Sequence, residues 1–316
     1  MQKKTNKKVS IIGMGAVGAG IAYALMLKDI ADELVFIDID EKLVNAEMLD
    51  IRHGIPNMGR TKITCGSYKD IKNSDMIIIT AGRSRKSNES RLDLAGENIK
   101  IAESIAQNLE KHYNKGVILV VSNPVDVITY YLTKRLKLEK GKIFGTGCIL
   151  DSSRLTNVIS DYIKLDTGFI NISIIGEHGS TQIPAWSNAE AAQMPLDEYC
   201  KAINLPFGAK EKAAMEKKVR NMGTEIIAGK GKTYYGISTC VCFIADAVLN
   251  NRNITASVSS LLHGEYGIDD VALSLPSLIN SGGVKLILPV KYSLEEISLL
   301  NQSAQALKSI NSKVCM

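Results

Sequence analysis

Three residues near the middle of this chain are of the types that carry out acid–base chemistry on a carboxylic acid. Asp151 and Arg154 are three residues apart at the start of a predicted helix, so their side chains can share one face of it. His178 stands in a glycine-flanked turn directly after the apolar run 170–175. A histidine that transfers protons needs an acid to fix its tautomer and stabilise its cation, and Asp151 is the natural candidate.

Each of these residues also has a purely structural explanation. An acid and an arginine in the first turn of a helix can form an ordinary surface ion pair. A lone histidine is more often structural than catalytic. His178, however, follows a predicted strand and is not on the apolar face of a helix, which favours a functional position.

Further polar residues follow two other predicted strands. The strand at 75–80 leads into residues 83–91, which hold four Arg or Lys against one Glu. This segment is either a solvated loop or a mobile lid that brings cations, including Arg85 and Arg91, onto an anionic substrate. Asn123 precedes a proline at the end of another apolar strand, and such a turn can aim its amide into a cleft.

A glycine-rich turn near the N-terminus predicts a dinucleotide site. Gly13, Gly15 and Gly18 follow the apolar run 9–12 and open a helix, and Asp38 stands twenty residues past the last glycine. The first glycine permits the tight turn, the second lets a pyrophosphate approach the backbone, and the third lets helix and strand pack closely. Asp38 would bind a ribose hydroxyl and repel the 2′-phosphate of NADP, so NAD is the expected cofactor.

The elements that must position these residues alternate through the first half of the chain. Its strand candidates are 9–12, 33–38, 61–65, 75–80, 117–122 and 143–146, and its helical segments are 19–28, 41–52, 92–113 and 125–137. The strands are apolar on both faces, as parallel strands covered by helices on both sides are. The pattern predicts an α/β fold, a Rossmann-type doubly wound parallel sheet whose ligand lies beyond the carboxyl ends of the strands.

The pattern changes near residue 150. Helices near 150–164, 209–229, 233–250 and 293–310 then alternate irregularly with the run 170–175 and with strand-like segments at 256–262, 270–275 and 284–288. We therefore expect an NAD-binding Rossmann domain at 1–148 and an α+β substrate-binding catalytic domain at 149–316. No linker of low complexity separates them, so they are expected to pack as one body.

Composition argues against several classes of function. The 316 residues carry a net charge of +5, but the basic residues are scattered and do not alternate with aromatics, so no nucleic-acid partner is expected. The six cysteines show neither a CxxC spacing nor a cluster with histidine, so we expect no metal and the reduced thiols of a cytoplasmic protein.

Basic residues before the first apolar run could suggest a signal peptide or a membrane anchor. That run holds four glycines, and we expect no membrane association.

Taken together, the motifs resemble those of the L-lactate dehydrogenases and the lactate dehydrogenase-like malate dehydrogenases over nearly the whole chain. The matching segments are 13–18, 38, 89–92, 122–126, 150–154, 176–179 and 230–235. The resemblance implies that His178 is the catalytic acid and base and Asp151 its partner. It also implies that Arg154 binds the substrate carboxylate, while Arg91 polarises the reacting carbonyl.

The resemblance further implies a small 2-oxo or 2-hydroxy acid as substrate and a homotetramer or homodimer as the assembly. Asn123 and Thr233 would line the substrate site. The NAD-binding residues would be Gly13, Gly15, Ala16, Val17, Gly18, Asp38, Thr80, Ala81, Gly82, Asn98, Val121 and Asn123.

The sequence leaves two substrates open. Arg85 falls where, by the resemblance, malate enzymes carry Arg and lactate enzymes carry Gln, so it could pair with the second carboxylate of oxaloacetate. Glu89 and the segments around Cys148 and Trp186 resemble lactate enzymes, and Glu89 could neutralise Arg85. We predict an L-lactate dehydrogenase, with an L-malate dehydrogenase as the alternative. A non-catalytic NAD-binding regulator, which would need only the glycine turn and Asp38, is the remote one.

Two positions bear on regulation. Thr156 and Asn171 stand where, by the same resemblance, lactate dehydrogenases activated by fructose 1,6-bisphosphate carry Arg and His. Two cations suited to phosphate are therefore missing, and we predict no activation by this sugar bisphosphate.

Overall fold

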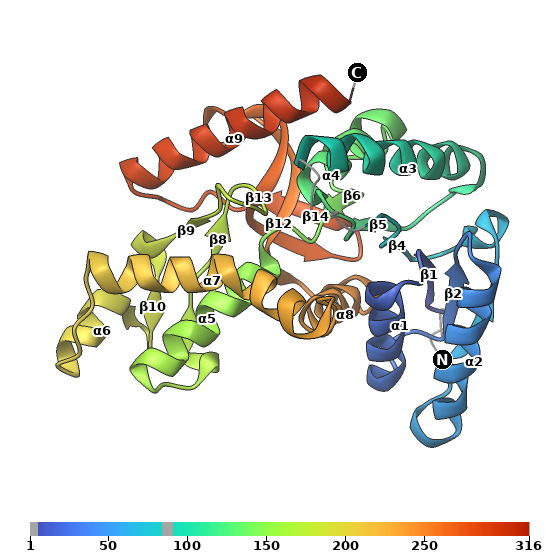
Figure 1. Cartoon of the computed structure of the whole chain (residues 1–316), viewed down its shortest axis with the longest axis horizontal. Coiled ribbons are helices and arrows are strands. Elements are labelled where there is room, and N and C mark those ends of the chain that lie inside the picture. Colours follow the sequence, from blue (N-terminus) through green and yellow to red (C-terminus); the bar gives the residue numbers. More distant parts are fainter. Residues whose placement is uncertain (1–5, 84–90, 316) are drawn as a thin grey trace.

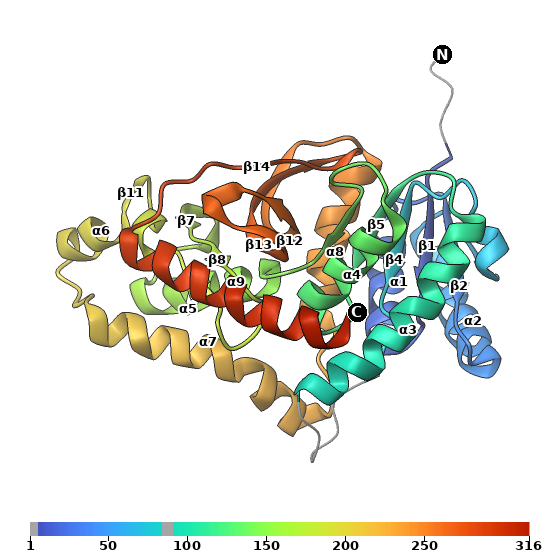
Figure 2. The same cartoon turned by 90° about the horizontal axis from the view of Figure 1, so that it is seen from above.

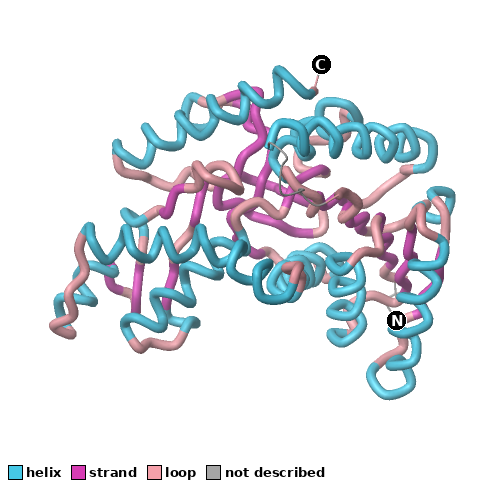
Figure 3. The backbone as a smooth tube through the Cα atoms, viewed as in Figure 1, coloured by secondary structure: helices cyan, strands magenta, loops and turns pink. Residues whose placement is uncertain are grey.

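The computed structural model describes residues 6–83 and 91–315, and within them a nine-stranded sheet runs through both halves of the chain (Figures 1 and 3). The strand order is β3-β2-β1-β4-β5-β6-β12-β13-β14. Its strands are β1 (Lys8–Ile12), β2 (Glu33–Ile37), β3 (Lys62–Cys65), β4 (Met76–Ile79), β5 (Val117–Val120), β6 (Ile143–Gly145), β12 (Ile254–His263), β13 (Asp269–Asn280) and β14 (Gly283–Ile287).

Strands β1 to β6 pair in parallel, so the predicted doubly wound sheet is confirmed. The order of strands reverses between β1 and β4, and in such sheets the ligand lies at this point, beyond the carboxyl ends. Both faces of β4 and β5 are buried, which explains their unbroken apolar sequences.

Helices cover both faces of the sheet. Figure 1 places α3, α4 and α9 on one side and α1 and α8 on the other, and Figure 2 shows α1 and α2 at one end of the molecule with α5, α6 and α7 toward the other. The helices described are α1 (Ala16–Lys28), α2 (Glu41–Met58), α3 (Arg91–His112), α4 (Val125–Leu136), α5 (Ile149–Ile163), α6 (Leu196–Ala202), α7 (Ala209–Lys230), α8 (Tyr235–Leu249) and α9 (Leu294–Val314).

The second half continues the main sheet and adds a smaller core. Strand β12 pairs antiparallel with β6 through Ser259 and Gly145, which joins the β12–β14 meander to the parallel strands. The short strands β7 (Ile170–Asn171), β8 (Ile174–Ile175), β9 (Ile183–Pro184), β10 (Glu190–Ala191) and β11 (Met194–Pro195) form two small sheets elsewhere in the described chain. Leu155 and Ile159 of α5 belong to a second apolar cluster with Val219 of α7. No helix of the described residues is long and apolar enough to cross a membrane.

Several elements differ from the sequence predictions; the strand predicted at 270–275, for example, continues to Asn280 as β13. The helix predicted at 19–28 begins at Ala16, because Gly15 is already its N-cap residue. The helix predicted at 41–52 continues to Met58 through Pro56, whose missing N–H costs one helical hydrogen bond, to the Arg52 carbonyl. The run 170–175 is not one strand: β7 and β8 belong to different sheets, and Ile174, the first residue of β8, donates its N–H to the Ser152 hydroxyl of α5.

Candidate active site

Asp151 lies between His178 and Arg154. Its Oδ2 is 2.5 Å from Nδ1 of His178, and its Oδ1 accepts a hydrogen bond of 3.1 Å from Nη1 of Arg154. The Asp151 side chain is 4% exposed, whereas the His178 ring is 26% exposed. The predicted sharing of one helix face by Asp151 and Arg154 is confirmed. Because Nδ1 of His178 is held by Asp151, Nε2 is the ring nitrogen left to face a ligand.

The surrounding charges favour an ionised pair. Burial disfavours the charged imidazole, but the carboxylates of Asp151 and Asp126 outweigh it and raise the pKa of His178 above its ordinary value. Burial likewise disfavours the Asp151 carboxylate, yet His178 and Arg154 hold the pKa of Asp151 below its ordinary value. Both shifts favour a carboxylate beside an imidazolium, which is a proton donor held in place.

The turn that carries His178 is fixed on several sides. Ser303 of α9 accepts the Glu177 N–H at 2.9 Å, and the Glu177 carboxylate accepts the Thr181 N–H at 3.1 Å. Asp126 accepts the N–H of His178 itself at 2.7 Å. Neither Asp126 nor Ser303 is among the residues that the sequence predicts for the site. Only one feature of the sequence could have pointed to Asp126, which is its place in segment 122–126, one of the segments that resemble the family.

The glycine-rich turn fits a dinucleotide. Gly13 has φ +101°, and a Cβ added there would lie 2.4 Å from the Ala81 nitrogen, while one at Gly18 would lie 2.0 Å from the Gly13 carbonyl oxygen. Gly13 and Gly18 are therefore required by packing. A Cβ at Gly15 would meet no heavy atom within 4 Å, so this backbone, at the start of α1, is open to a ligand.

Asp38 follows β2 and lies beside this turn. Its carboxylate accepts the N–H of Met14 at 2.5 Å and that of Asp40 at 3.0 Å. The acid is therefore held next to the glycine-rich turn, as an acid that binds the adenosine ribose must be. Ala16 and Val17 form the first turn of α1.

The carboxyl ends of β4 and β5 are tied together. Thr80 donates to the Gly13 carbonyl at 2.6 Å, and Ser122 donates to the Ala81 carbonyl at 2.6 Å. Asn98 of α3 donates to the Asn123 carbonyl at 2.6 Å and accepts the Arg83 N–H at 3.0 Å. The proposed NAD-binding residues thus share one edge of the sheet. Gly82 and Asn123 are exposed there, and Val121 is buried.

The remaining predicted residues are placed only in part. Thr233 lies half-buried in the connection between α7 and α8. Arg91 is the first residue of α3, but its side chain is not described, and Arg85 lies outside the described residues together with Glu89. Among residues 6–83 and 91–315, no group of three or more His, Cys, Asp or Glu side chains is arranged to hold a metal ion.

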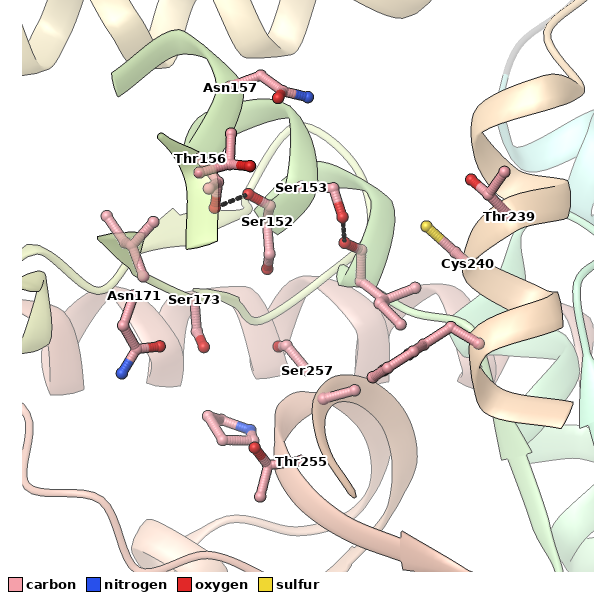
Figure 4. Close-up of a pocket in the computed structure, with 16 residues that line it drawn as sticks. Ser152, Ser153, Thr156, Asn157, Asn171, Ser173, Thr239, Cys240, Thr255 and Ser257 are labelled. Carbon is pink, nitrogen blue, oxygen red and sulfur yellow. Dashed lines mark hydrogen bonds between the residues drawn. The ribbon is translucent and has the colours of Figure 1, made fainter. Parts of the chain in front are cut away.

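A separate pocket of about 490 Å³ brings Thr156 and Asn171 together (Figure 4). Hydroxyl and amide side chains from α5, α8 and β12 dominate its wall, among them Ser152, Thr239 and Thr255. No Lys, Arg or His is among the described residues that line it. The pocket therefore presents hydrogen-bonding groups without a positive side chain.

Comparisons with known proteins cover nearly the whole chain. Residues 7–145 match the family model described as lactate/malate dehydrogenase, NAD binding domain, and residues 148–315 match its alpha/beta C-terminal domain. The chain is 40% identical to an L-lactate dehydrogenase of Acetivibrio thermocellus, over 97% of each chain. It is also 40% identical to one of Clostridium perfringens, over 98% of this chain and 97% of the other.

Solved structures agree with these relatives. A lactate dehydrogenase from a Medee basin deep-sea metagenome library superposes with a TM-score of 0.94 at 34% identity, over 98% of this chain and 99% of that one. The minor L-lactate dehydrogenase of Enterococcus mundtii gives a TM-score of 0.94 at 33% identity, with the same shares covered.

Proposed function

Because the chain belongs to the lactate/malate dehydrogenase family, we propose that it is an NAD-dependent L-lactate dehydrogenase, which interconverts pyruvate and NADH with L-lactate and NAD. The relatives of Acetivibrio thermocellus and Clostridium perfringens are both named for this activity. The malate alternative, which rested on Arg85, is not favoured.

The observation that carries an enzymatic function is the Arg154–Asp151–His178 arrangement, with its contacts of 3.1 and 2.5 Å. A regulator that only binds NAD would have no use for a buried carboxylate holding an imidazole. The arrangement supports assigning His178 as the acid and base, Asp151 as its partner and Arg154 as the group that binds the substrate carboxylate. Arg91 is proposed to polarise the carbonyl.

Each role follows from the side chain's chemistry. NADH bound at the glycine-rich turn would supply the hydride. Negative charge then grows on the carbonyl oxygen of pyruvate, and protonated His178 stabilises that charge and donates its proton from Nε2. Asp151 keeps the proton on Nδ1 and stabilises the cation. Arg154 orients pyruvate because a guanidinium can bind both carboxylate oxygens in one plane.

We also propose the cellular and structural setting. All six cysteines lie among the described residues as free thiols, which suits the reducing cytoplasm. The assembly is proposed to be a homotetramer or homodimer, and the functional units to be the NAD-binding domain 1–148 and the catalytic domain 149–316.

Pyruvate is expected to have a higher kcat/KM than oxaloacetate when both are assayed with NADH on one preparation. Oxaloacetate carries a second carboxylate that the lactate site does not need. A preference for oxaloacetate of about a hundredfold, roughly 2.7 kcal/mol, would restore the malate alternative and assign Arg85 to its second carboxylate. Reduction of neither acid by a preparation that binds NADH would favour the regulator.

Fructose 1,6-bisphosphate is expected to leave the KM for pyruvate unchanged. None of the described residues that line the pocket at Thr156 and Asn171 is cationic, and a sugar bisphosphate needs cations to offset its charge. The KM is measured from initial rates over a range of pyruvate concentrations, with and without the bisphosphate. Inorganic phosphate at equal ionic strength is the control. A clear drop in KM with the bisphosphate alone would overturn this prediction.

A further inference from the structure

Asp126 is a buried carboxylate that the proposed mechanism does not use. It stands in the first turn of α4, and its side chain is 2% exposed. Its Oδ2 accepts the backbone N–H of His178 at 2.7 Å, while its Oδ1 makes no well-formed hydrogen bond among the described residues and has only the nearby Ser259 hydroxyl to favour its charge. An asparagine would accept the same N–H without a buried charge. Because burying an incompletely bonded carboxylate is costly, the charge itself calls for an explanation.

The position of Asp126 links the two halves of the site. It follows the turn at Asn123, whose carbonyl is held by Asn98 at the cofactor edge of the sheet. His178 comes from the second half of the chain, and Ser303, which holds the neighbouring Glu177, also belongs to that half. The 2.7 Å bond therefore connects the main chain of His178 directly to the element that follows β5.

We propose that Asp126 is a positioning residue, which fixes the main chain of His178 against the cofactor edge of the sheet and places a second negative charge behind the imidazole. The inference rests on the proposed function. Asp126 touches neither substrate nor cofactor in this proposal, and it acts through His178.

The charges around the pair define what Asp126 does at each pH. Burial raises the pKa of Asp126 to about 6; Ser259 and His178 favour its charged form, and Glu177 opposes it. The imidazole is faced by the Asp151 and Asp126 carboxylates and by the Arg154 guanidinium, and both carboxylates raise its pKa. Burial raises the pKa of the nearby Cys148 thiol, and the charges of Asp151 and Asp126 add to this effect. At neutral pH, Asp126 is therefore ionised and stabilises the imidazolium.

Two variants separate position from charge. Asp126→Asn keeps an acceptor for the His178 N–H and removes the charge, whereas Asp126→Ala removes both. With Asn, the alkaline fall of kcat/KM for pyruvate is expected to move to lower pH by about half a unit or more, because the imidazolium loses a stabilising charge. With Ala, kcat is expected to fall in addition by about tenfold at pH values where His178 is protonated. NADH affinity stays within about twofold in both.

Thr129→Val is the matched control, because Thr129 is buried on the same helix and its hydroxyl has no partner among the described residues. It is expected to move neither the pH profile nor kcat. If the Asn variant follows the wild-type profile and both Asp126 variants lose only thermal stability, the proposal is wrong. If the Ala variant does not fold, the pH profile of the Asn variant still tests the effect of the Asp126 charge.

A second readout does not depend on turnover. The chain has four histidines, so comparison with His178→Asn assigns the ring signals of His178 in an NMR titration. The proposal expects the His178 ring in Asp126→Asn to lose its proton at lower pH than in the wild type, and an unchanged titration would overturn it. Wild-type protein that reduces no pyruvate would instead overturn the proposed function.

Discussion

His178→Asn is expected to lower kcat/KM for pyruvate by about a thousandfold to ten-thousandfold while leaving NADH binding intact. An amide can still hydrogen-bond to Asp151, so the buried carboxylate keeps a partner. The asparagine amide cannot donate a proton to the carbonyl oxygen of pyruvate, and it cannot carry the positive charge that stabilises the negative charge on that oxygen. Each of these contributions to the rate is large. The glycine-rich turn and Asp38, which are proposed to hold the cofactor, are unaffected.

The measurement pairs steady-state kinetics with an NADH titration followed by fluorescence. His263→Asn is the control, because His263 is exposed at the end of β12, and it should leave both quantities unchanged. Retention of turnover within about tenfold by His178→Asn would remove His178 from the chemistry. A protein that binds NADH equally with and without His178, and shows no turnover in either form, would be the regulator.

The raised pKa of His178 gives the wild-type enzyme a defined pH dependence. In the proposed mechanism the reduction of pyruvate needs the protonated ring of His178, so the active form is expected to be fully present below that pKa. As pH rises through it, kcat/KM should fall by about tenfold per unit, while the opposite reaction, which needs the neutral ring, should gain. Because two carboxylates raise the pKa, this fall begins at higher pH than an isolated histidine would give.

Much of the fold could be predicted from sequence because parallel strands have a simple signature. Residues 76–79 and 117–120 are apolar at every position, which only burial on both faces explains, and the glycine-rich turn marked the switch point beside β1. The Asp151–Arg154 pair could also be predicted, since a helix places residues three apart on one face. These are local regularities.

Residues that depend on tertiary contacts could not be predicted in this way. The contact between Asp151 and His178 spans 27 positions, and only the need of a histidine for an acid suggested it. The break within 170–175 reflects the pairing of β7 with β10 and of β8 with β9, and the seven-residue helix α6 is too short to show a clear period. Asp126 resembled an ordinary helix-initial acid until the fold brought the His178 turn against it.

Arg154→Lys is expected to raise the KM for pyruvate strongly and to lower kcat/KM by about a hundredfold to a thousandfold. Lysine keeps the positive charge but not the planar fork that can bind two carboxylate oxygens. The Arg154 side chain is 16% exposed, and its Nη1 contacts Asp151, which leaves its other nitrogens for the proposed contact with the substrate carboxylate. A shorter point charge cannot meet Asp151 and pyruvate with the same geometry.

The control for Arg154→Lys is Arg220→Lys on α7, whose guanidinium pairs with Glu216 at 3.3 Å and has no assigned substrate. Kinetic constants within about twofold of wild type are expected there, because surface ion pairs contribute little. Binding of oxamate, an unreactive analogue that carries the same carboxylate as pyruvate, separates affinity from chemistry. If Arg154→Lys bound oxamate normally and lost only kcat, Arg154 would act on the reacting centre through Asp151 and His178, and the carboxylate would have to be bound elsewhere.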